Sequence, residues 1–446
     1  MNESPVLSTK DLSFNYPTGV SALKKITLEI KKGRKVVFLG PNGAGKSTLF
    51  LHFNGIFKPK SGEVLFEGVP IKYDQKSLAR LRESVAMVLQ NPDDQIFSTT
   101  VEEDVAFGPM NLRLDRGEVE RRIDEALHLV GMEDLRRRPT QQLSFGQRKR
   151  VSLAGALAMR PKVLIMDEPT AGLDSEMVHE LMELSDELNQ GGMTMIMSTH
   201  DIETAYEWAD DMMVMYRGEL LFTGSPDELF TRHELIDRLR IVPPFTVRMN
   251  QQSYYRTGRP EMPLPRDLVE LTLKCFPMEG QPGERADLDP SVKIAPPPMG
   301  TLYIIDVLDP GFPEQVLSLS TKIADLHDVS GTYGAKAGRL VREGKIDVHH
   351  SFHALENALL QVSLGKEYVL YTDASLMPLL GSRLSKLERK SGKMVNLRFC
   401  SHSTSMPKEE VEPPKQERQD GQRHPGGAAL RSNPGLTAPH GNESAQ

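Results

Sequence analysis

The spacing of apolar residues changes twice along the first 240 residues. Residues 6–39 alternate apolar and polar positions between turn residues, which predicts antiparallel strands and then a buried strand, KVVFLG, entering a glycine-rich loop. Residues 77–160 repeat apolar positions mostly at helical spacing, as in RGEVERRIDEALHLVGM. From residue 161, short apolar runs alternate with helical segments: KVLIMDEPT, SEMVHELMELSDELNQGG, MTMIMSTH and DIETAYEWA. This rhythm predicts a parallel sheet with crossover helices, followed by a hairpin in DDMMVMYRGELLFTGSP.

Beyond residue 240 the pattern predicts three further regions. Residues 241–300 are rich in proline and predict a connector with limited structure, in which RDLVELTLKCF forms one short helix. Residues 301–400 resume the β/α rhythm and predict a small α/β domain. Its strands are expected in TLYIIDVLD, KIDVHH, EYVLYTD and MVNLRF, with helices near 313–327, 352–363 and 375–391. Residues 401–446 have the composition of a disordered tail.

Composition and charge exclude several classes of protein. A length of 446 residues suggests two or three domains, the first spanning 1–240. The net charge of -7 gives no basic field, so we expect no nucleic-acid partner. Two cysteines cannot build a disulfide framework, which fits a reducing cytosol. The sequence begins with no secretory signal pattern and contains no run near the roughly 20 apolar residues that span a bilayer, so another chain would supply any membrane part.

A phosphate-binding loop follows the strand KVVFLG. The stretch GPNGAGKST matches the pattern G-x-x-x-x-G-K-[ST] and consists of Gly40, Pro41, Asn42, Gly43, Ala44, Gly45, Lys46, Ser47 and Thr48. Its glycines let backbone N–H groups face phosphate oxygens, Lys46 reaches the outer phosphates, and Ser47 binds Mg²⁺. A chance glycine-rich turn is the alternative, but a strand before and a helix after argue against it. The loop predicts ATP and Mg²⁺ as cofactors.

Polar side chains end three of the predicted strands. Asp167 and Glu168 end VLIMDEP, where Asp167 would hold Mg²⁺ through water and Glu168 would orient the water that attacks ATP. His200 would contact the γ-phosphate and this water, and Gln90 would reach Mg²⁺ and water. Each residue taken singly also fits a plain role: an ordinary polar strand end, a packed or solvated histidine, or a surface amide.

Two further features predict nucleotide contacts. In QLSFGQRKR, Ser144 can cap a helix that begins with Phe145, Gly146 and Gln147, and Gly146 permits close approach of a phosphate. A capped surface helix with a basic face is the alternative. Tyr16, upstream of the phosphate loop, could stack on adenine.

In this order and spacing, these motifs together with AGLD resemble the ATP-binding-cassette (ABC) ATPases over about residues 5–240. The resemblance implies an α/β fold: a P-loop NTPase cassette with a parallel core sheet, an antiparallel β subdomain and a helical signature subdomain. It also implies a head-to-tail dimer with a second ABC ATPase chain, in which ATP lies between one phosphate loop and the other chain's Ser144–Gln147. Asp174 would lie at that dimer interface. Phe145 departs from the family's usual glycine, but Glu168 and His200 are both present, so we expect hydrolysis.

A finer resemblance lies in QNPDDQIFSTTVEEDVAFGPMNL, LSFGQRKRVSLAGALAMRP, MDEPTAGLD, TGSPDELF and RLRIVPPFTVRM. These stretches are similar to the energy-coupling-factor subgroup, and most of all to the cobalt-transport ATPases called CbiO. Ser175 departs from the proline that is usual there. In family transporters, the segment after Gln90 receives a short helix from the membrane subunit.

The same segment has the composition of a docking surface. An acidic rim would surround apolar anchors: Asp93, Asp94, Glu102, Glu103 and Asp104 around Ile96, Phe97, Val101 and Phe107. We expect Asp94, Phe97 and Glu103 to couple the chain to a basic, amphipathic helix of a membrane partner. A solvated acidic helix is the alternative.

The expected function is ATP hydrolysis that powers cobalt or nickel uptake through integral membrane subunits of the energy-coupling-factor type. The chain would then lie peripherally on the cytoplasmic face of the cell membrane. The closest alternative is the shared ATPase for vitamin uptake. A non-transport ABC ATPase is a different class, but the chain has neither a second cassette nor a long coiled coil. A third possibility is a regulatory protein that retains ATPase activity.

The region 301–400 resembles no family that we recognise. His349, His350 and His353 have a spacing compatible with a metal site, with Asp347 and Glu356 nearby, although surface histidines are the preferred interpretation. A small ligand could instead bind at strand ends near Asp306, Asp309 or Asp373.

Overall fold

The computed structural model describes residues 5–257, 262–275, 299–309, 312, 329–350, 354–363, 365–391 and 394–400. Met1–His402 form one compact unit. The predicted helix near 313–327, His353 and the predicted tail 401–446 lie outside the described residues.

The first sheet is the predicted antiparallel subdomain. Its strands have the order β2-β1-β4-β5, and every neighbouring pair is antiparallel. Buried and exposed residues alternate along much of β2, as expected where one face of a sheet packs on a core. The strands are β1 (Pro5–Asn15), β2 (Ser21–Lys31), β4 (Ser61–Phe66) and β5 (Val69–Pro70).

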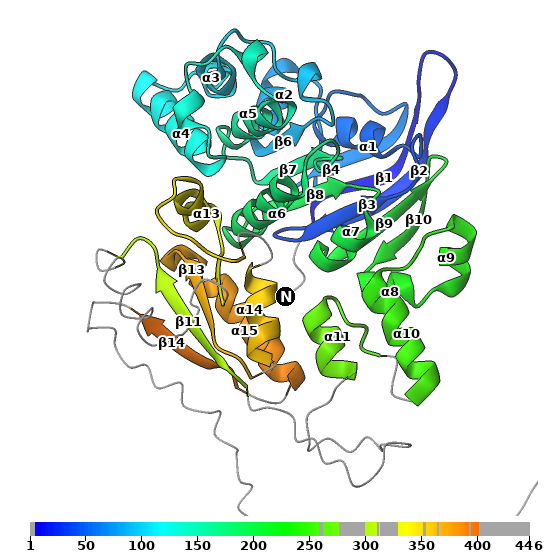
Figure 1. Cartoon of the computed structure of the whole chain (residues 1–446). Coiled ribbons are helices and arrows are strands. Elements are labelled where there is room, and N and C mark those ends of the chain that lie inside the picture. Colours follow the sequence, from blue (N-terminus) through cyan, green and yellow to red (C-terminus); the bar gives the residue numbers. More distant parts are fainter. Residues whose placement is uncertain are drawn as a thin grey trace, which may run out of the picture. The chain divides into compact units, whose positions relative to one another are not determined.

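The second sheet is the predicted parallel core, in the order β10-β9-β3-β8-β7-β6 (Figure 1). Only β10 runs antiparallel to its neighbour. Every residue of β7 and β8 is buried, as both faces of a covered parallel sheet require. The strands are β3 (Lys35–Leu39), β6 (Val85–Val88), β7 (Val163–Asp167), β8 (Thr194–Ser198), β9 (Asp211–Tyr216) and β10 (Glu219–Gly224).

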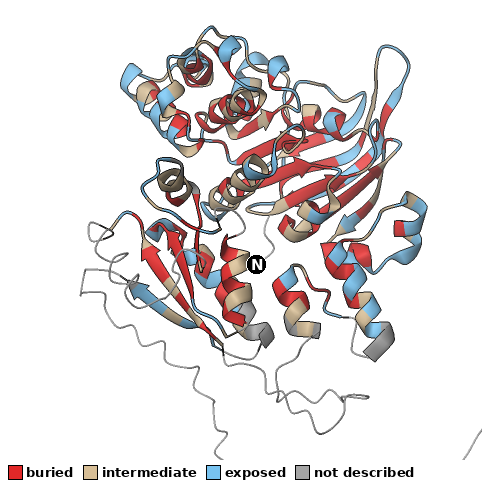
Figure 2. Cartoon of the chain, in the orientation of Figure 1, coloured by how far each residue is buried: buried red, intermediate tan, exposed pale blue. Residues whose placement is uncertain are grey.

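Helices connect these strands. Residues 77–160 are mostly helical, as predicted. The connecting helices are α1 (Lys46–Phe53), α2 (Gln75–Ser84), α3 (Val101–Asn111), α4 (Arg116–Leu129), α5 (Phe145–Leu157), α6 (Ser175–Gln190), α7 (Ile202–Trp208), α8 (Pro226–Phe230) and α9 (His233–Leu239). Short 3₁₀ turns lie at Pro92–Asp94, Glu133–Leu135 and Thr140–Gln142. Figure 2 shows burial concentrated in the sheets and on the helix faces that cover them.

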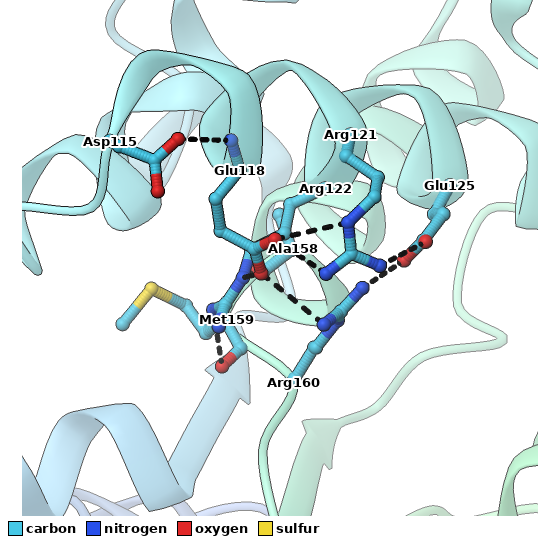
Figure 3. Close-up of polar contacts among 8 residues, drawn as sticks. All are labelled: Asp115, Glu118, Arg121, Arg122, Glu125, Ala158, Met159 and Arg160. Atoms are coloured by element: carbon cyan, nitrogen blue, oxygen red, sulfur yellow. Dashed lines mark hydrogen bonds and ion pairs between the residues drawn. The ribbon is translucent and has the colours of Figure 1, made fainter.

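An ion-pair network joins α4 to the chain just after α5 (Figure 3). Glu118 accepts from Arg122 at 2.8 Å and from Arg121 at 2.5 Å, and lies 3.3 Å from Arg160. These guanidinium groups, Arg122 and Arg121 above all, lower the pKa of Glu118 to about 2. Arg122 also donates to the carbonyl oxygens of Ala158 and Met159. The helical subdomain is therefore held together by charge-assisted bonds as well as by its apolar core.

The proline-rich connector contains more structure than predicted. The expected short helix is α11 (Leu268–Cys275), but α10 (Phe245–Thr257) was not predicted. Val247 and Leu264 are buried in the same apolar cluster as the helical subdomain. Val269 of α11 packs instead into the core of the C-terminal domain. Packing at these few apolar positions, rather than local pattern, selects the helices.

The C-terminal domain has a parallel sheet of order β12-β13-β11-β14. Its elements are β11 (Thr301–Asp306), β12 (Ser330–Thr332), α13 (Ala335–Arg342), α14 (Ala354–Ser363), β13 (Tyr368–Thr372), η4 (Ala374–Leu376), α15 (Met377–Ser391) and β14 (Asn396–Cys400).

One strand of this domain was predicted in the wrong place. The segment KIDVHH forms only an isolated bridge between His350 and Gly331, while the unpredicted β12 has the sequence SGT. A Cβ at Gly331 would lie 2.5 Å from the Tyr368 hydroxyl and 2.7 Å from Ala354 Cβ. There is therefore no room for a side chain at position 331. The short segment SGT has no apolar pattern that would predict a strand.

Candidate ATP site

The phosphate loop lies between β3 and α1 and requires glycine at two of its positions. A Cβ at Gly40 would lie 2.1 Å from the Met215 carbonyl oxygen, and one at Gly45 would lie 2.6 Å from that of Ala22. Both glycines have positive φ, 145° and 106°. No side chain caps the first turn of α1, and that turn holds no acidic residue. Its backbone N–H groups are thus positioned to bind an anion.

Lys46 lies inside this loop. Its side chain is buried and its Nζ donates to the Gly40 carbonyl oxygen at 2.6 Å. Burial lowers the pKa of Lys46, an effect that Glu168 and then Asp167 oppose. A buried ammonium group beside uncapped backbone N–H groups fits the phosphates of a nucleotide.

The acidic pair follows β7 at the edge where the parallel strands end. Ser198, at the end of β8, donates to Asp167 Oδ1 at 2.5 Å and accepts from the Glu168 N–H at 2.9 Å. Glu168 has a φ of 46°, which residues other than glycine rarely adopt. Ser198 therefore fixes both acids. The sequence analysis missed it, although it precedes His200 by only two positions.

Glu168 has one engaged and one unengaged oxygen. Its Oε2 lies 2.8 Å from His200 Nδ1, while its Oε1 is buried, 3.9 Å from Lys46 Nζ, and has no hydrogen-bond partner among the described residues. The His200 side chain is exposed. An oriented carboxylate with an unsatisfied oxygen can accept a proton from a water molecule.

Lys149 of α5 is a second residue that the sequence analysis missed. Its Nζ donates to the carbonyl oxygens of Glu168 at 3.2 Å, Pro169 at 2.6 Å and Ala171 at 2.7 Å. Burial lowers the pKa of Lys149 to about 8. A surface helix with a basic face was the alternative for this segment, yet Lys149, the central residue of RKR, links the signature helix to the loop after Glu168.

The signature residues lie where the sequence placed them, at the start of α5. Ser144 caps the helix, accepting from the Gln147 N–H at 3.2 Å, and the Gln147 side chain accepts from the Ser144 N–H at 3.0 Å. A Cβ at Gly146 would lie 2.3 Å from Met177 Sδ. Gly146 is therefore needed for contact with α6 as well as for any approach of phosphate.

The unusual Phe145 has a packing partner. Its ring lies against Gly172 of the AGLD loop, where a Cβ would come within 2.9 Å of Phe145 Cε1. Asp174, two residues later, caps α6 by accepting from the Met177 N–H at 2.8 Å. The departure at Phe145 thus joins the signature to the AGLD loop.

Tyr16 and Gln90 occupy different surroundings. The Tyr16 hydroxyl lies 2.9 Å from Thr48 Oγ1, and its ring meets Phe14 and Phe57 edge to face. Tyr16 therefore borders the phosphate loop, and its contact with adenine stays a prediction. Gln90 is exposed just after β6.

The predicted acidic rim is wrong at Asp104, and two of its other acids have internal partners although they stay at the surface. Asp104 is buried and accepts from the N–H groups of Phe97 and Ser98. Asp93 pairs with Arg148 at 2.8 Å, and Glu102 pairs with Arg136 at 3.0 Å.

Glu103 forms a capping box with Thr100 at the start of α3. Among the rim acids, Asp94 and Glu103 are exposed without an ion pair among the described residues. Three consecutive helical residues point in different directions, so Glu102, Glu103 and Asp104 could not share one rim.

The apolar anchors are partly as predicted. Val101 is fully buried and cannot serve as one. Phe97 and Phe107 are exposed, with their ring centroids 4.6 Å apart, and Met110 is exposed one helical turn after Phe107. We call Phe97, Phe107 and Met110 the Phe97 patch.

The histidines of the C-terminal domain do not converge on a metal site within the described residues. His349 and His350 have ring centroids 4.5 Å apart, and His350 Nδ1 lies 3.0 Å from the Tyr368 hydroxyl. Burial, and then His349, lower the pKa of His350. Over the described ranges, no group of three His, Cys, Asp or Glu side chains could hold a metal ion.

No described helix is long and apolar enough to cross a membrane.

Fold and site together define an α/β P-loop ATPase of the ABC class. The phosphate loop, the Asp167–Glu168 pair and the capped signature helix lie on the cassette's sheets and helical subdomain, and the cassette binds ATP.

Comparison with known proteins narrows this class. The family model described as ABC transporter matches residues 23–171. The energy-coupling factor transporter ATP-binding protein EcfA of Methanocaldococcus jannaschii is 55% identical over 236 residues, which cover 53% of this chain and 85% of that protein. EcfA2 of Methanospirillum hungatei is 35% identical over 395 residues, 88% of this chain and 96% of that protein.

A solved structure, cbiO1 from Clostridium perfringens, described as part of the ABC transporter complex cbiONQ, is 47% identical. The match covers 54% of this chain and 96% of the cbiO1 chain, with a TM-score of 0.48.

The chain belongs to the family of energy-coupling-factor ABC transporter ATP-binding proteins, whose ATP hydrolysis is coupled to membrane transport. The 395-residue match reaches well beyond the cassette, so the similarity extends into the C-terminal region, contrary to the sequence-based expectation.

Proposed function

We propose that the chain powers the uptake of cobalt or nickel ions through integral membrane subunits, to which it binds peripherally at the cytoplasmic face of the cell membrane. Family membership supports the coupling to membrane transport. The choice of metal rests on the CbiO-like motifs, from QNPDDQIFSTT to TGSPDELF.

The unsatisfied, buried Oε1 of Glu168 carries the catalytic assignment. In this proposal Glu168 orients and polarises the attacking water, and His200 positions the Glu168 carboxylate through its 2.8 Å contact. Lys46 and the loop N–H groups hold the phosphates. Ser47, Gln90 and Asp167 would hold Mg²⁺, which would neutralise charge that develops on the phosphates.

A complete site needs two chains. Within one chain, Lys149 and Phe145 join the signature helix to the loops that follow β7, so the exposed Ser144 at the start of that helix is available to a second ATPase chain. We propose that ATP lies between the phosphate loop of one chain and Ser144–Gln147 of the other, with Asp174 at the interface. Closure on ATP and reopening after hydrolysis would change the shape of the surface that binds the membrane subunits.

The Phe97 patch is the proposed contact with those subunits. Exposed aromatic rings surrounded by polar residues are typical of protein-binding surfaces. Asp94 and Glu103 remain as exposed acids that could pair with a basic partner helix.

The direct test is recovery of the chain with its membrane partners from native membranes in mild detergent. A Phe97→Ser, Phe107→Ser double variant should lose these partners while it still binds ATP. The matched control, Val20→Ser with Val69→Ser, removes exposed apolar residues elsewhere and should keep them. Partners retained by the double variant would refute the docking assignment.

The identity of the partners tests the substrate. One fixed set that includes a metal-binding subunit supports metal uptake. Several small substrate-binding membrane proteins sharing one common partner would instead indicate the closest alternative, a vitamin-uptake ATPase.

A further inference from the structure

A cavity of about 150 Å³ lies between the signature helix α5, helix α6 and helix α13 of the C-terminal domain. All three belong to the compact unit Met1–His402. Much of its wall is apolar, with Leu153, Leu184 and Val341 among the lining residues. A dry apolar cavity of this size can hold a molecule about as large as benzene.

Helix α13 is fixed to the cassette at both sides of this cavity. The Gly334 N–H donates to Glu183 Oε2 of α6 at 3.2 Å, and Glu183 also lies 3.0 Å from His179. Arg339 of α13 donates to Glu133 in the helical subdomain at 2.7 Å. An occupant of the cavity would therefore contact the helical subdomain, the helix that follows the AGLD loop, and the C-terminal domain together.

The cations that line the cavity already have partners. Arg150 pairs with Glu180 at 2.5 Å, and Lys336 lies 3.6 Å from Asp373. Lys149 is bound to three carbonyl oxygens, and Arg339 to Glu133.

Two acceptors in the cavity wall lack partners. No hydrogen bond or ion pair within the described ranges reaches the half-buried carboxylate of Glu187. Thr332, 2% exposed, also lines the cavity, and its Oγ1 has no hydrogen-bond partner among the described residues. The Thr332 oxygen has almost no accessible surface, whereas the unpaired Glu187 carboxylate beside an apolar wall fits a ligand that brings a positive charge and N–H donors.

Burial shifts the pKa values of the acids around the cavity. Burial, and then Asp373, raise the pKa of Glu187. Burial also raises the pKa of Glu183. Burial alone would lower the pKa of His179, yet Glu183 raises it. The two carboxylate shifts thus follow mainly from burial, and Lys336 opposes the shift of Glu187, whereas the His179 shift reflects the acidic neighbours of that histidine.

We propose that this cavity binds a small organic ammonium ion, with its N–H groups on Glu187 and its apolar body against Leu153, Leu184 and Val341. The body would have about six to ten non-hydrogen atoms, given the cavity's size. Because the cavity adjoins Gly146 and the helix that begins just after Asp174, an occupant also changes the rate of ATP hydrolysis. Neither statement depends on the transported substrate.

The first experiment uses the full chain and two probes of nearly equal shape, benzylammonium and the neutral benzyl alcohol. Isothermal titration calorimetry should show benzylammonium binding at least about tenfold more tightly, since a hydrogen bond to a charged group is worth that much. Equal binding of the two probes, or no binding of benzylammonium, would overturn the proposal.

One conservative variant locates the site. Glu187→Gln keeps the side-chain shape and should weaken benzylammonium binding about tenfold, which removes its preference over benzyl alcohol. Glu63→Gln, an exposed acid on β4, is the control and should leave binding unchanged. An unchanged melting temperature and unchanged ATP turnover without probe show that each variant is folded. Benzylammonium affinity unaffected by Glu187→Gln would refute the site, and ATP turnover unaffected at saturation would refute its regulatory role.

Discussion

The cassette and the C-terminal domain share a strand-to-helix turn at the edge of a sheet, but the groups that bind to this turn differ between them. Each has a strand, a glycine-containing loop and a helix whose first turn carries a lysine: β3, α1 and Lys46 in one, β12, α13 and Lys336 in the other. In the cassette no side chain caps α1, and Lys46 bonds to the backbone of its own loop. In the C-terminal domain Glu183 accepts from the N–H that precedes α13, and Asp373 lies beside Lys336.

This difference teaches that a glycine-rich strand-to-helix turn is a ligand site only where the protein leaves its donors open. The uncapped first turn of α1 stays available for a phosphate. The first turn of α13 likewise has no side-chain cap, but the Gly334 N–H just before it is bound to a carboxylate of the cassette, so that edge serves to join two domains.

The largest effect is expected at the catalytic carboxylate. Glu168→Gln should lower ATP hydrolysis by roughly 10²–10⁴-fold, the range for loss of a positioned general base, because its amide cannot accept the water's proton. Phosphate release measures the rate. ATP binding, followed by fluorescence of a labelled analogue, should persist, and a rate within twofold of the unchanged protein would contradict the assignment.

Loss of the buried lysine should affect stability and activity together. Lys149→Met removes the donor to three carbonyl oxygens and should lower the free energy of unfolding by about 3 kcal/mol, since unsatisfied buried polar groups are costly. Chemical denaturation measures it. Lys162→Met, whose lysine forms one exposed ion pair with Glu67, is the control and should change stability by less than about 1 kcal/mol. Equal losses in the two variants would show that Lys149 is not a structural link.

The pH dependence of stability tests the junction between the two regions. Burial, and then Glu356 and Asp267, raise the pKa of Glu207 from 4.5 to about 7. The folded state then binds more protons than the unfolded state between these values. Stability from this group is therefore complete below about pH 4.5 and is lost as pH rises toward 7.

Glu207→Gln should remove this loss, which amounts to about 3 kcal/mol for a shift of that size. Unfolding free energies of the two proteins at pH 5 and pH 8 give the comparison. The unfolding free energy of the variant should exceed that of the unchanged protein by more at pH 8 than at pH 5. A difference that does not change with pH would show that Glu207 titrates normally.

The smallest effect is expected where the signature meets the AGLD loop. Gly172 has a φ of 75° and no room for a Cβ beside Phe145, whereas Gly192 has a φ of 93° and nothing within 4 Å. Gly172→Ala should therefore destabilise the protein by about 1–2 kcal/mol more than Gly192→Ala, since both carry the same backbone strain. Melting temperatures measure the difference. Equal melting temperatures would mean that the Phe145 ring can shift at no cost in stability.

The sequence predicted those parts of the molecule that depend on local pattern. The buried run of β7, the phosphate loop and the cap at Ser144 are each contained in a few neighbouring residues. Ser198 and Lys149 were missed because their partners lie 31 and 20 positions away along the chain. The strand β12 was missed because SGT is selected by the space beside Tyr368, and the acidic rim was overestimated because Asp104 turns inward to the loop at Phe97.

The central claim is that hydrolysis at Glu168 drives metal uptake through a membrane partner. The most direct measurement is accumulation of radiolabelled cobalt and nickel in cells that carry the co-purified membrane subunits with either the unchanged chain or Glu168→Gln. We predict accumulation of one of these metals with the unchanged chain and none above background with the variant. Equal accumulation in both strains, or uptake of a vitamin in place of either metal, would contradict the account.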